Sequence, residues 1–179
     1  MSDIYVFSGP CGCGKSTLAD AFAAHMVEDG GKTQIYVIHG DDFHRGFRES
    51  DRRGHPSFLQ WADILAFNWE CMLNTASSAL RRGLDVVIDY VVEDELPLLK
   101  TLAAEHGARL YYVVLSVTER ELEQRLTQRG SAELIERSLF LKAKLESLPE
   151  NLGHIYDISG KTVKAEVLDL DMERYEIRL

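Results

Sequence analysis

The chain has 179 residues, of which 45% are hydrophobic and 27% charged, and its acidic residues outnumber its basic residues by 29 to 20. This length suits one domain that buries a core without disulfide support. The net charge of -9 repels phosphate backbones and anionic membrane surfaces, and so argues against a nucleic-acid or membrane partner. The three cysteines are too few for a disulfide framework, and the sequence contains no signal peptide. We therefore expect a reduced, cytoplasmic protein, as a monomer or homodimer.

Short apolar segments alternate with helical patterns along the whole chain, and each apolar segment is typical of a strand buried on both faces. The predicted strands are 4–7, 35–38, 84–89, 109–116 and 155–158. The first predicted helix follows the glycines near 14, and the second starts at a capping box of Ser57 and Gln60 and runs to 82. Three more predicted helices cover 97–106, 119–128 and 132–147, and a short terminal helix begins after Thr162. The polar stretch 43–56 is predicted to be a loop or a mobile insertion.

Strands that alternate with helices predict parallel pairing, because a parallel connection needs a crossover. We expect a three-layer α/β/α fold with a five-stranded parallel sheet, in a single domain over 1–179. Such a fold binds ligands at the carboxyl ends of its strands.

Residues Gly9 to Ser16 have the sequence GPCGCGKS, which matches the phosphate-loop pattern G-x-x-x-x-G-K-S/T between a predicted strand and a predicted helix. Glycines let the backbone curl so that several N–H groups converge on phosphate oxygens at a helix N-terminus. Lys15 is expected on the β- and γ-phosphates and Ser16 on Mg²⁺, with Thr17 near the α-phosphate. The predicted ATP-binding residues of the loop are Gly9, Cys11, Gly12, Cys13, Gly14, Lys15, Ser16 and Thr17.

The two loop cysteines leave two interpretations open. Cys11 and Cys13 occupy variable positions of the pattern, where small side chains suffice. A helix N-terminus also favours a thiolate, so redox control is a second hypothesis.

With this loop, the chain resembles the small P-loop kinases of the AAA-33 type, which include gluconate kinase, shikimate kinase and adenylylsulfate kinase. The resemblance extends to the stretch from Gly40 to His44 and to the arginines around 125–129. It implies a P-loop NTPase fold, ATP and Mg²⁺ as cofactors, and phosphoryl transfer to a hydroxyl group. The proline-rich continuation that gluconate kinase shows after this histidine is missing, so gluconate itself is not carried over as substrate.

Carboxylates follow two of the predicted strands. In gluconate kinase a carboxylate at the position of Asp41 faces the acceptor hydroxyl, and an acid there can orient that hydroxyl and accept its proton. Asp41 is the first candidate and Asp42 the second, with His44 as a further substrate contact; both acids could instead be turn residues or caps. Asp89 ends a Walker-B-like strand and is predicted to bind magnesium or substrate, unless it caps the next loop. Ser16, Asp41 and Asp89 are thus the candidate metal ligands.

Basic residues supply the remaining candidates. Arg125 and Arg129 share a helix face, and the resemblance implies that they pack on adenine or close a lid over 118–147, with Arg125 as a catalytic residue beside Lys15. A solvated helix face is the alternative. Arg48 belongs to a second arginine cluster, at 45–53, that could steer an anionic acceptor or simply be solvated.

The sequence therefore predicts an ATP:alcohol phosphotransferase that acts on a small molecule. A polynucleotide 5′-hydroxyl kinase or a nucleotide kinase is the alternative within the same chemistry. A nucleotide-binding switch without phosphoryl transfer is the alternative of another class. No guanine-reading Asn-Lys-x-Asp tetrapeptide occurs in the chain.

Overall fold

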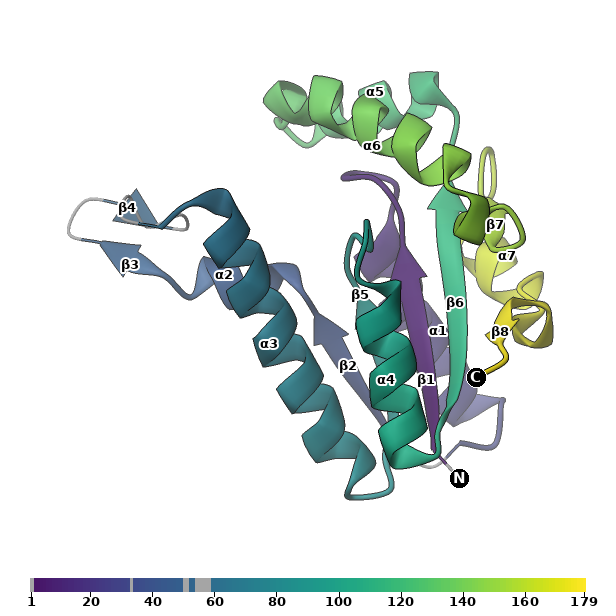
Figure 1. The fold of residues 1–179 in the computed structure, drawn as a ribbon. Helices are drawn as coiled ribbons and strands as arrows, with labels where there is room; N and C mark the ends of the chain where they lie inside the picture. The colour runs from purple at the N-terminus through teal and green to yellow at the C-terminus, as the bar shows by residue number, and fades with distance from the viewer. Residues whose placement is uncertain (1, 33, 50–51, 54–58) are drawn as a thin grey trace.

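A central sheet of mainly parallel strands, covered by helices on both faces, forms the body of the molecule (Figure 1). The computed structural model describes residues 2–32, 34–49, 52–53 and 59–179. The sheet order is β2-β5-β1-β6-β7, and a sixth strand, β8, pairs antiparallel with β6. The strands are β1 (Asp3–Ser8), β2 (Ile35–His39), β5 (Asp85–Asp89), β6 (Arg109–Ser116), β7 (Ile155–Asp157) and β8 (Glu176–Ile177).

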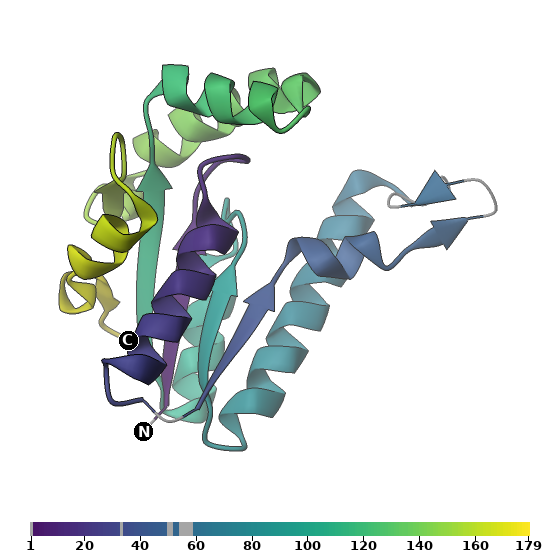
Figure 2. The ribbon, with the colours of Figure 1, turned by 180° about the vertical axis from the view of Figure 1, so that it is seen from behind.

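Helices connect the parallel strands and fill both outer layers. They are α1 (Lys15–Glu28), α2 (Asp41–Arg45), α3 (Trp61–Leu80), α4 (Leu96–His106), α5 (Glu119–Gln128), α6 (Ile135–Ser147) and α7 (Val163–Leu168). Helices α3 and α4 cover one face, and α1 and α7 cover the other, as the two opposite views show (Figures 1 and 2). The predicted three-layer α/β/α fold is therefore confirmed.

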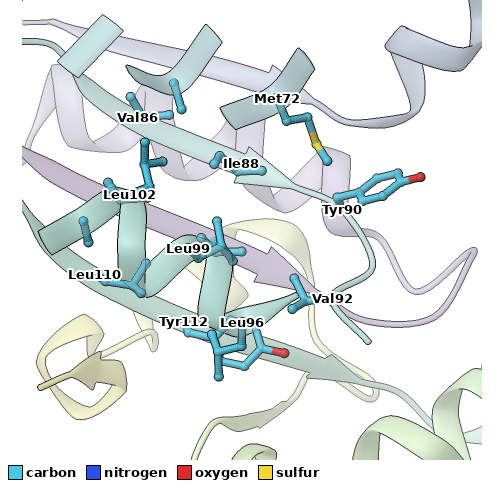
Figure 3. Close-up of a cluster of buried hydrophobic side chains, with 14 of the residues drawn as sticks. Met72, Val86, Ile88, Tyr90, Val92, Leu96, Leu99, Leu102, Leu110 and Tyr112 are labelled. Carbon is cyan, nitrogen blue, oxygen red and sulfur yellow. The ribbon is translucent and has the colours of Figure 1, made fainter. Parts of the chain in front are cut away.

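Alternation along the strands divides the core into two clusters. In β1, Ile4 and Val6 face the cluster under α3 and α4, whereas Tyr5 and Phe7 face the cluster under α1. Figure 3 shows the first cluster, in which side chains of α4 and of β5 interdigitate. Each large apolar side chain buried in this way contributes about 1.5–3 kcal/mol, so both layers are held by continuous apolar contact.

The helix boundaries follow from local hydrogen bonds. Helix α3 begins with a capping box between Gln60 and Asp63 and ends at Leu80, two residues before the predicted end. Ser57, the predicted cap, lies outside the described residues. Thr118 and Thr162 cap α5 and α7 through their hydroxyl oxygens, which accept from the backbone N–H groups three residues later.

The structure differs from the sequence prediction in two places. Within the stretch predicted as a loop, residues 41–45 form α2, and two short antiparallel strands follow, β3 (Arg48–Glu49) and β4 (Arg52–Arg53). The C-terminal strand β8, which pairs with the amino-terminal part of β6, was not predicted. Among the helices of the described segments, none combines the length and apolar character needed to cross a membrane.

The carboxyl ends of the parallel strands meet at one edge of the sheet, where the chain turns into the phosphate loop after β1 (Figure 1). Helices α5 and α6 lie across this edge, and α2 and the start of α3 flank it on the β2 side (Figure 2). The fold thus places the predicted loop, the strand-end carboxylates and the predicted lid together.

Candidate active site

The phosphate loop is a tight turn between β1 and α1. Gly12 and Gly14 have φ values of 79° and 111°, a region that side chains rarely adopt. A Cβ atom on Gly12 would lie 2.7 Å from Cδ2 of Leu126, so this glycine also lets α5 approach the loop. The Lys15 ammonium donates to the Pro10 carbonyl oxygen at 3.0 Å, which holds the cation over its own loop. This geometry gives a helix N-terminus and a lysine aimed at the same space.

Ser16, Asp89 and His39 form a hydrogen-bonded row beneath the loop. The Ser16 hydroxyl donates to Asp89 Oδ2 at 2.5 Å, and Nδ1 of His39 lies 2.5 Å from Asp89 Oδ1. The other ring nitrogen of His39 lies 3.3 Å from a carboxylate oxygen of Asp20 on α1. Three strand and helix ends, those of β2, β5 and α1, thus contribute to one polar cluster.

Burial and charge set the protonation of this cluster. Asp89 is 4% exposed, and this burial raises the pKa of its carboxyl, against the opposing effects of Ser16, His39 and Lys15. Burial alone would lower the pKa of His39, but the bond to Asp89 and the charges of Asp89 and Asp20 outweigh it and raise that pKa. The contact between Asp89 and His39 therefore favours the charged form of each group, against the effect of burial.

The donor set fits magnesium. A serine hydroxyl in contact with a carboxylate offers the hard oxygen ligands that Mg²⁺ prefers, and Mg²⁺ commonly takes its other ligands from phosphates and water. No group of three or more histidine, cysteine, aspartate or glutamate side chains in the described part of the chain forms a metal cage. The residues present therefore fit a metal ion that arrives with a phosphate ligand.

A cavity of about 790 Å³ opens above the loop and extends to both sides of it. It is lined by seven residues of the loop and the start of α1, by side chains from α2, α3 and the β5 end on one side, and by side chains from α5, α6 and α7 on the other. Because β1 is the middle strand of the sheet, the loop divides the cavity into two halves. We call the half on the β2 and β5 side the acceptor half, and the half on the β6 and β7 side the base half.

The acceptor half combines the carboxylate of Asp41 with aromatic walls, and Glu93 and Glu95 line it beyond the end of β5. Asp41, in the first turn of α2, lines this half together with the aromatic residues His44, Trp61, Trp69 and Tyr90. The amide of buried Asn68 donates to Nδ1 of His44 at 3.1 Å and to the Tyr90 hydroxyl at 3.0 Å. Asn68 thus fixes the orientation of two wall residues.

Three predicted substrate residues, Asp42, Arg48 and Asp89, lie outside the cavity lining. Asp89 belongs to the buried row with Ser16 and His39, and exposed Asp42 pairs with Arg45 at 3.0 Å. Arg48 donates to the backbone carbonyl oxygens of Arg45 and Phe47. The side chains of Arg52 and Arg53 are not among those described. The described arginines of this cluster therefore have partners in the protein itself.

Helices α5 and α6 rest directly on the phosphate loop. The Arg125 guanidinium donates to the Cys13 carbonyl oxygen at 2.6 Å, and the Ser138 hydroxyl donates to the Cys11 carbonyl oxygen at 2.9 Å. Arg129 also lines the cavity. The predicted lid segment and both of its predicted arginines therefore lie at the cavity.

Glu93, just after β5, ties α6 to the opposite wall of the cavity. Its carboxylate oxygens lie 2.9 Å from Arg137 and 2.9 Å from Lys144, both on α6. This bridge joins the two sides of the entrance. Sequence analysis did not identify Glu93, because no local pattern marks a contact across the sheet edge.

The base half contains residues that sequence analysis also missed. Lys161, Thr162, Val163 and Glu166, at the loop after β7 and on α7, line the cavity opposite Arg125. The available signal was their place just beyond the carboxyl end of the last predicted parallel strand. His39 was missed in the same way, although it directly precedes the Gly40 to His44 stretch.

The loop cysteines favour the simpler of their two interpretations. Cys13 is buried, and burial raises the pKa of its thiol above the ordinary value, although Lys15 and Arg125 act in the opposite direction. Cys11 contributes its carbonyl oxygen to the contact with α6. A thiolate at Cys13 is thus disfavoured, which argues against redox control at this residue.

The chain is similar to known proteins over most of its length. The family model described as AAA domain, AAA_33, matches residues 4–148. Guanylate kinase from Haemophilus ducreyi is 26% identical over 155 residues, which are 75% of this chain and 68% of that protein.

Solved structures support the same fold. APS kinase from Mycobacterium tuberculosis, solved in complex with AMPPNP and APS, superposes with a TM-score of 0.69 at 16% identity, over 94% of each chain. A gluconokinase from Sinorhizobium meliloti gives a TM-score of 0.58 at 18% identity, over 94% of this chain and 88% of that one. With its phosphate loop, sheet order and family match, the chain belongs to the AAA_33 family and has the fold of the P-loop kinases.

Proposed function

We propose that the protein is a magnesium- and ATP-dependent kinase that transfers the γ-phosphoryl group to a hydroxyl of a small molecule, with 1–179 as one kinase domain. The observation that carries this proposal is the contact of Ser16 with buried Asp89 beneath the loop, because Ser16 lines the same cavity as Asp41. A phosphate site, oxygen ligands for a metal and a carboxylate in the acceptor half are the parts that phosphoryl transfer requires. The three cysteines of the chain are unpaired, in keeping with a reduced, cytoplasmic location.

The chain's own groups support an in-line transfer. The acceptor oxygen forms a bond to the γ-phosphorus while the bond from that phosphorus to the bridging oxygen of the β-phosphate breaks. Asp41 would accept the proton that the acceptor hydroxyl loses. Lys15 and Arg125, on opposite sides of the loop, would stabilise the charge on the transferred group and on the leaving phosphate. Ser16 and Asp89 would hold Mg²⁺, directly or through water, and the ion would neutralise phosphate charge.

The walls of the acceptor half favour an acceptor with an apolar face. Trp61 is 46% exposed on the wall of this half, and Trp69 packs edge-on against Tyr90 with ring centroids 5.6 Å apart. Aromatic rings in such positions bind the apolar faces of sugars or planar rings. Arg45 and Arg137, the described cations on this side, are already paired with Asp42 and Glu93. We therefore propose an acceptor whose recognition depends on shape and hydroxyl groups more than on negative charge.

The proposal is tested by incubating the protein with γ-labelled ATP, Mg²⁺ and pooled sugars, polyols, nucleosides and hydroxyl-bearing antibiotics. We expect a labelled small molecule, no product with Lys15→Ala, and at least about a hundredfold slower transfer with Asp41→Asn, because general-base catalysis contributes this much. Asp42→Asn should keep transfer near the wild-type rate. Loss of transfer in Asp42→Asn but not in Asp41→Asn would reverse the assignment of the base. Phosphate release without any labelled acceptor would instead indicate a hydrolytic switch.

A nucleotide kinase is the second candidate, and the similarity to guanylate kinase over 155 residues favours it. The same assay with nucleoside monophosphates as acceptors tests this alternative. Formation of a labelled diphosphate would place the acceptor among nucleotides. Labelling of an oligonucleotide 5′ end would point to a polynucleotide kinase, against the expectation from the net charge of -9.

A further inference from the structure

Glu166 is a buried carboxylate without a partner in the base half of the cavity. The residue is 4% exposed, lies on α7, and lines the cavity with Lys161 and Thr162. Within the described segments, its carboxylate makes no hydrogen bond or ion pair, and the backbone carbonyl of Glu166 is the group that accepts from Tyr156. In the described part of the chain, the fully enclosed side-chain polar atoms without a partner belong to Asn68, Trp69 and Glu121, so the Glu166 oxygens keep access to the cavity, where a ligand can reach them.

The charged neighbours of Glu166 do not satisfy it. Burial raises the pKa of its carboxyl, and the charges of Arg125 and Lys161 oppose this shift from a distance. Arg125 uses its guanidinium on the Cys13 carbonyl oxygen, and Lys161 bonds the Tyr156 hydroxyl at 3.2 Å and pairs with Asp169 at 3.3 Å. The cations around this carboxylate are therefore held by other groups, which leaves its oxygens for a ligand.

The position of Glu166 indicates what that ligand would present. A nucleotide held by its phosphates at the central loop has the transferred phosphate toward Asp89 and Asp41, so its base extends into the other half, between Arg125 and α7. An arginine on one wall suits the face of a planar base. An ionised carboxylate accepts hydrogen bonds and cannot donate one, so it matches an N–H group on the edge of the base.

We propose that Glu166 selects the nucleobase by accepting a hydrogen bond from an N–H group on its edge. This inference rests on the proposed function, because it requires a nucleotide on the phosphate loop. Adenine offers its 6-amino group, and guanine offers N1–H together with its 2-amino group. An unsubstituted purine offers no such donor. Glu166 is thus a specificity residue, separate from the residues that hold the phosphates.

The test measures the dissociation constants of MgATP, MgGTP and magnesium purine riboside triphosphate by calorimetry. We expect wild-type protein to bind ATP, GTP or both at least about tenfold more tightly than the unsubstituted purine nucleotide, since a hydrogen bond to a charged group is worth this much. The tighter of the two natural nucleotides identifies the edge that Glu166 contacts. Equal binding of all three nucleotides would overturn the proposal.

Glu166→Met removes both acceptor oxygens and keeps the length of the side chain, and Glu123→Met, at an exposed position of α5, is the matched control. We expect the first variant to bind all three nucleotides alike and the control to discriminate as wild type does. We also expect Glu166→Met to melt no lower than wild type, because it removes a buried unpaired charge. Discrimination that persists in Glu166→Met, or a uniform loss of affinity with a lower melting temperature, would show a structural role instead. Loss of binding of every nucleotide by wild-type protein would count against the phosphate site and hence the proposed function.

Discussion

At the scale of single residues, Gly12 lies where the phosphate loop meets α5. It combines a left-handed backbone with direct contact to Leu126 of α5, so it serves the shape of the loop and the packing above it. The phosphate-loop pattern leaves this position variable, and the need for a curled backbone is the reason that the sequence offers for a glycine here. It does not predict the helix contact, because Leu126 lies more than one hundred residues along the chain.

Gly12→Ala should therefore disturb both the backbone of the loop and the packing of α5 on it. We expect nucleotide affinity to fall at least about tenfold, because the new methyl group pushes α5 and Arg125 away from the loop and strains the turn by about 1–2 kcal/mol. Gly160→Ala is the control, since Gly160 also has a positive φ, of 70°, but a Cβ atom there meets open space. Calorimetric titration with MgATP, beside thermal melts of both variants, measures the difference. Equal effects of the two substitutions would mean that the Leu126 contact is unimportant.

At the scale of elements, local pattern and long-range contact account for different parts of the structure. Strands β1, β5 and β6 are continuous apolar runs, and their burial on both faces follows from the sequence alone. Helix α2 and strand β8 escaped prediction because distant partners stabilise them: Asn68 holds His44 of α2, and the edge of β6 pairs with β8. The base half was missed for the same reason, since sequence does not show that α7 lies opposite Arg125.

Helix α6 depends on one carboxylate across the entrance. Glu93→Gln should free Arg137 and leave Lys144 with Asp94 at 3.6 Å. We expect faster amide hydrogen exchange over 135–147, with a loss of at most about 1 kcal/mol in the free energy of unfolding because the pairs are partly exposed. Exchange in α4, measured in the same experiment, should stay as in wild type. Unchanged exchange in α6 would show that contacts with the loop alone hold the helix.

At the scale of the whole molecule, the amino ends of the strands carry a second polar cluster, at the far edge of the sheet from the cavity. Asp3 is fully buried at the start of β1, and its carboxylate accepts from Nε of Arg109 at 2.8 Å and from Lys32 at 2.6 Å. Burial alone would raise the pKa of Asp3, but Arg109 and Lys32 outweigh it, so the pKa lies below the ordinary value of 3.8. The stability that Asp3 contributes is therefore present above that value and is lost as the pH falls through the lower folded-state pKa.

Asp3→Asn should reveal this contribution. We expect the free energy of unfolding at pH 7 to fall by about 2–4 kcal/mol, because the substitution removes the buried carboxylate partner of Arg109 and leaves Lys32 with Asp85 alone. The acid side of the stability curve, between about pH 5 and pH 3, should become flatter than in wild type. Urea unfolding across this range measures both effects, with exposed Glu105→Gln as control. If the free energy of unfolding of Asp3→Asn falls as steeply as that of wild type over this acidic range, other carboxylates cause the acid unfolding.

The order of strands around β1 has a consequence for how this molecule can diversify. The acceptor half is built from residues 41–95, and the base half from residues 125–166, apart from the α6 residues that reach across. Under the proposed function, one contiguous block of chain would recognise the molecule that receives the phosphate, and another would recognise the nucleotide that donates it. Exchange of the first block between relatives would then change the acceptor and keep the nucleotide site, so recombination at two junctions would be enough to produce a new specificity.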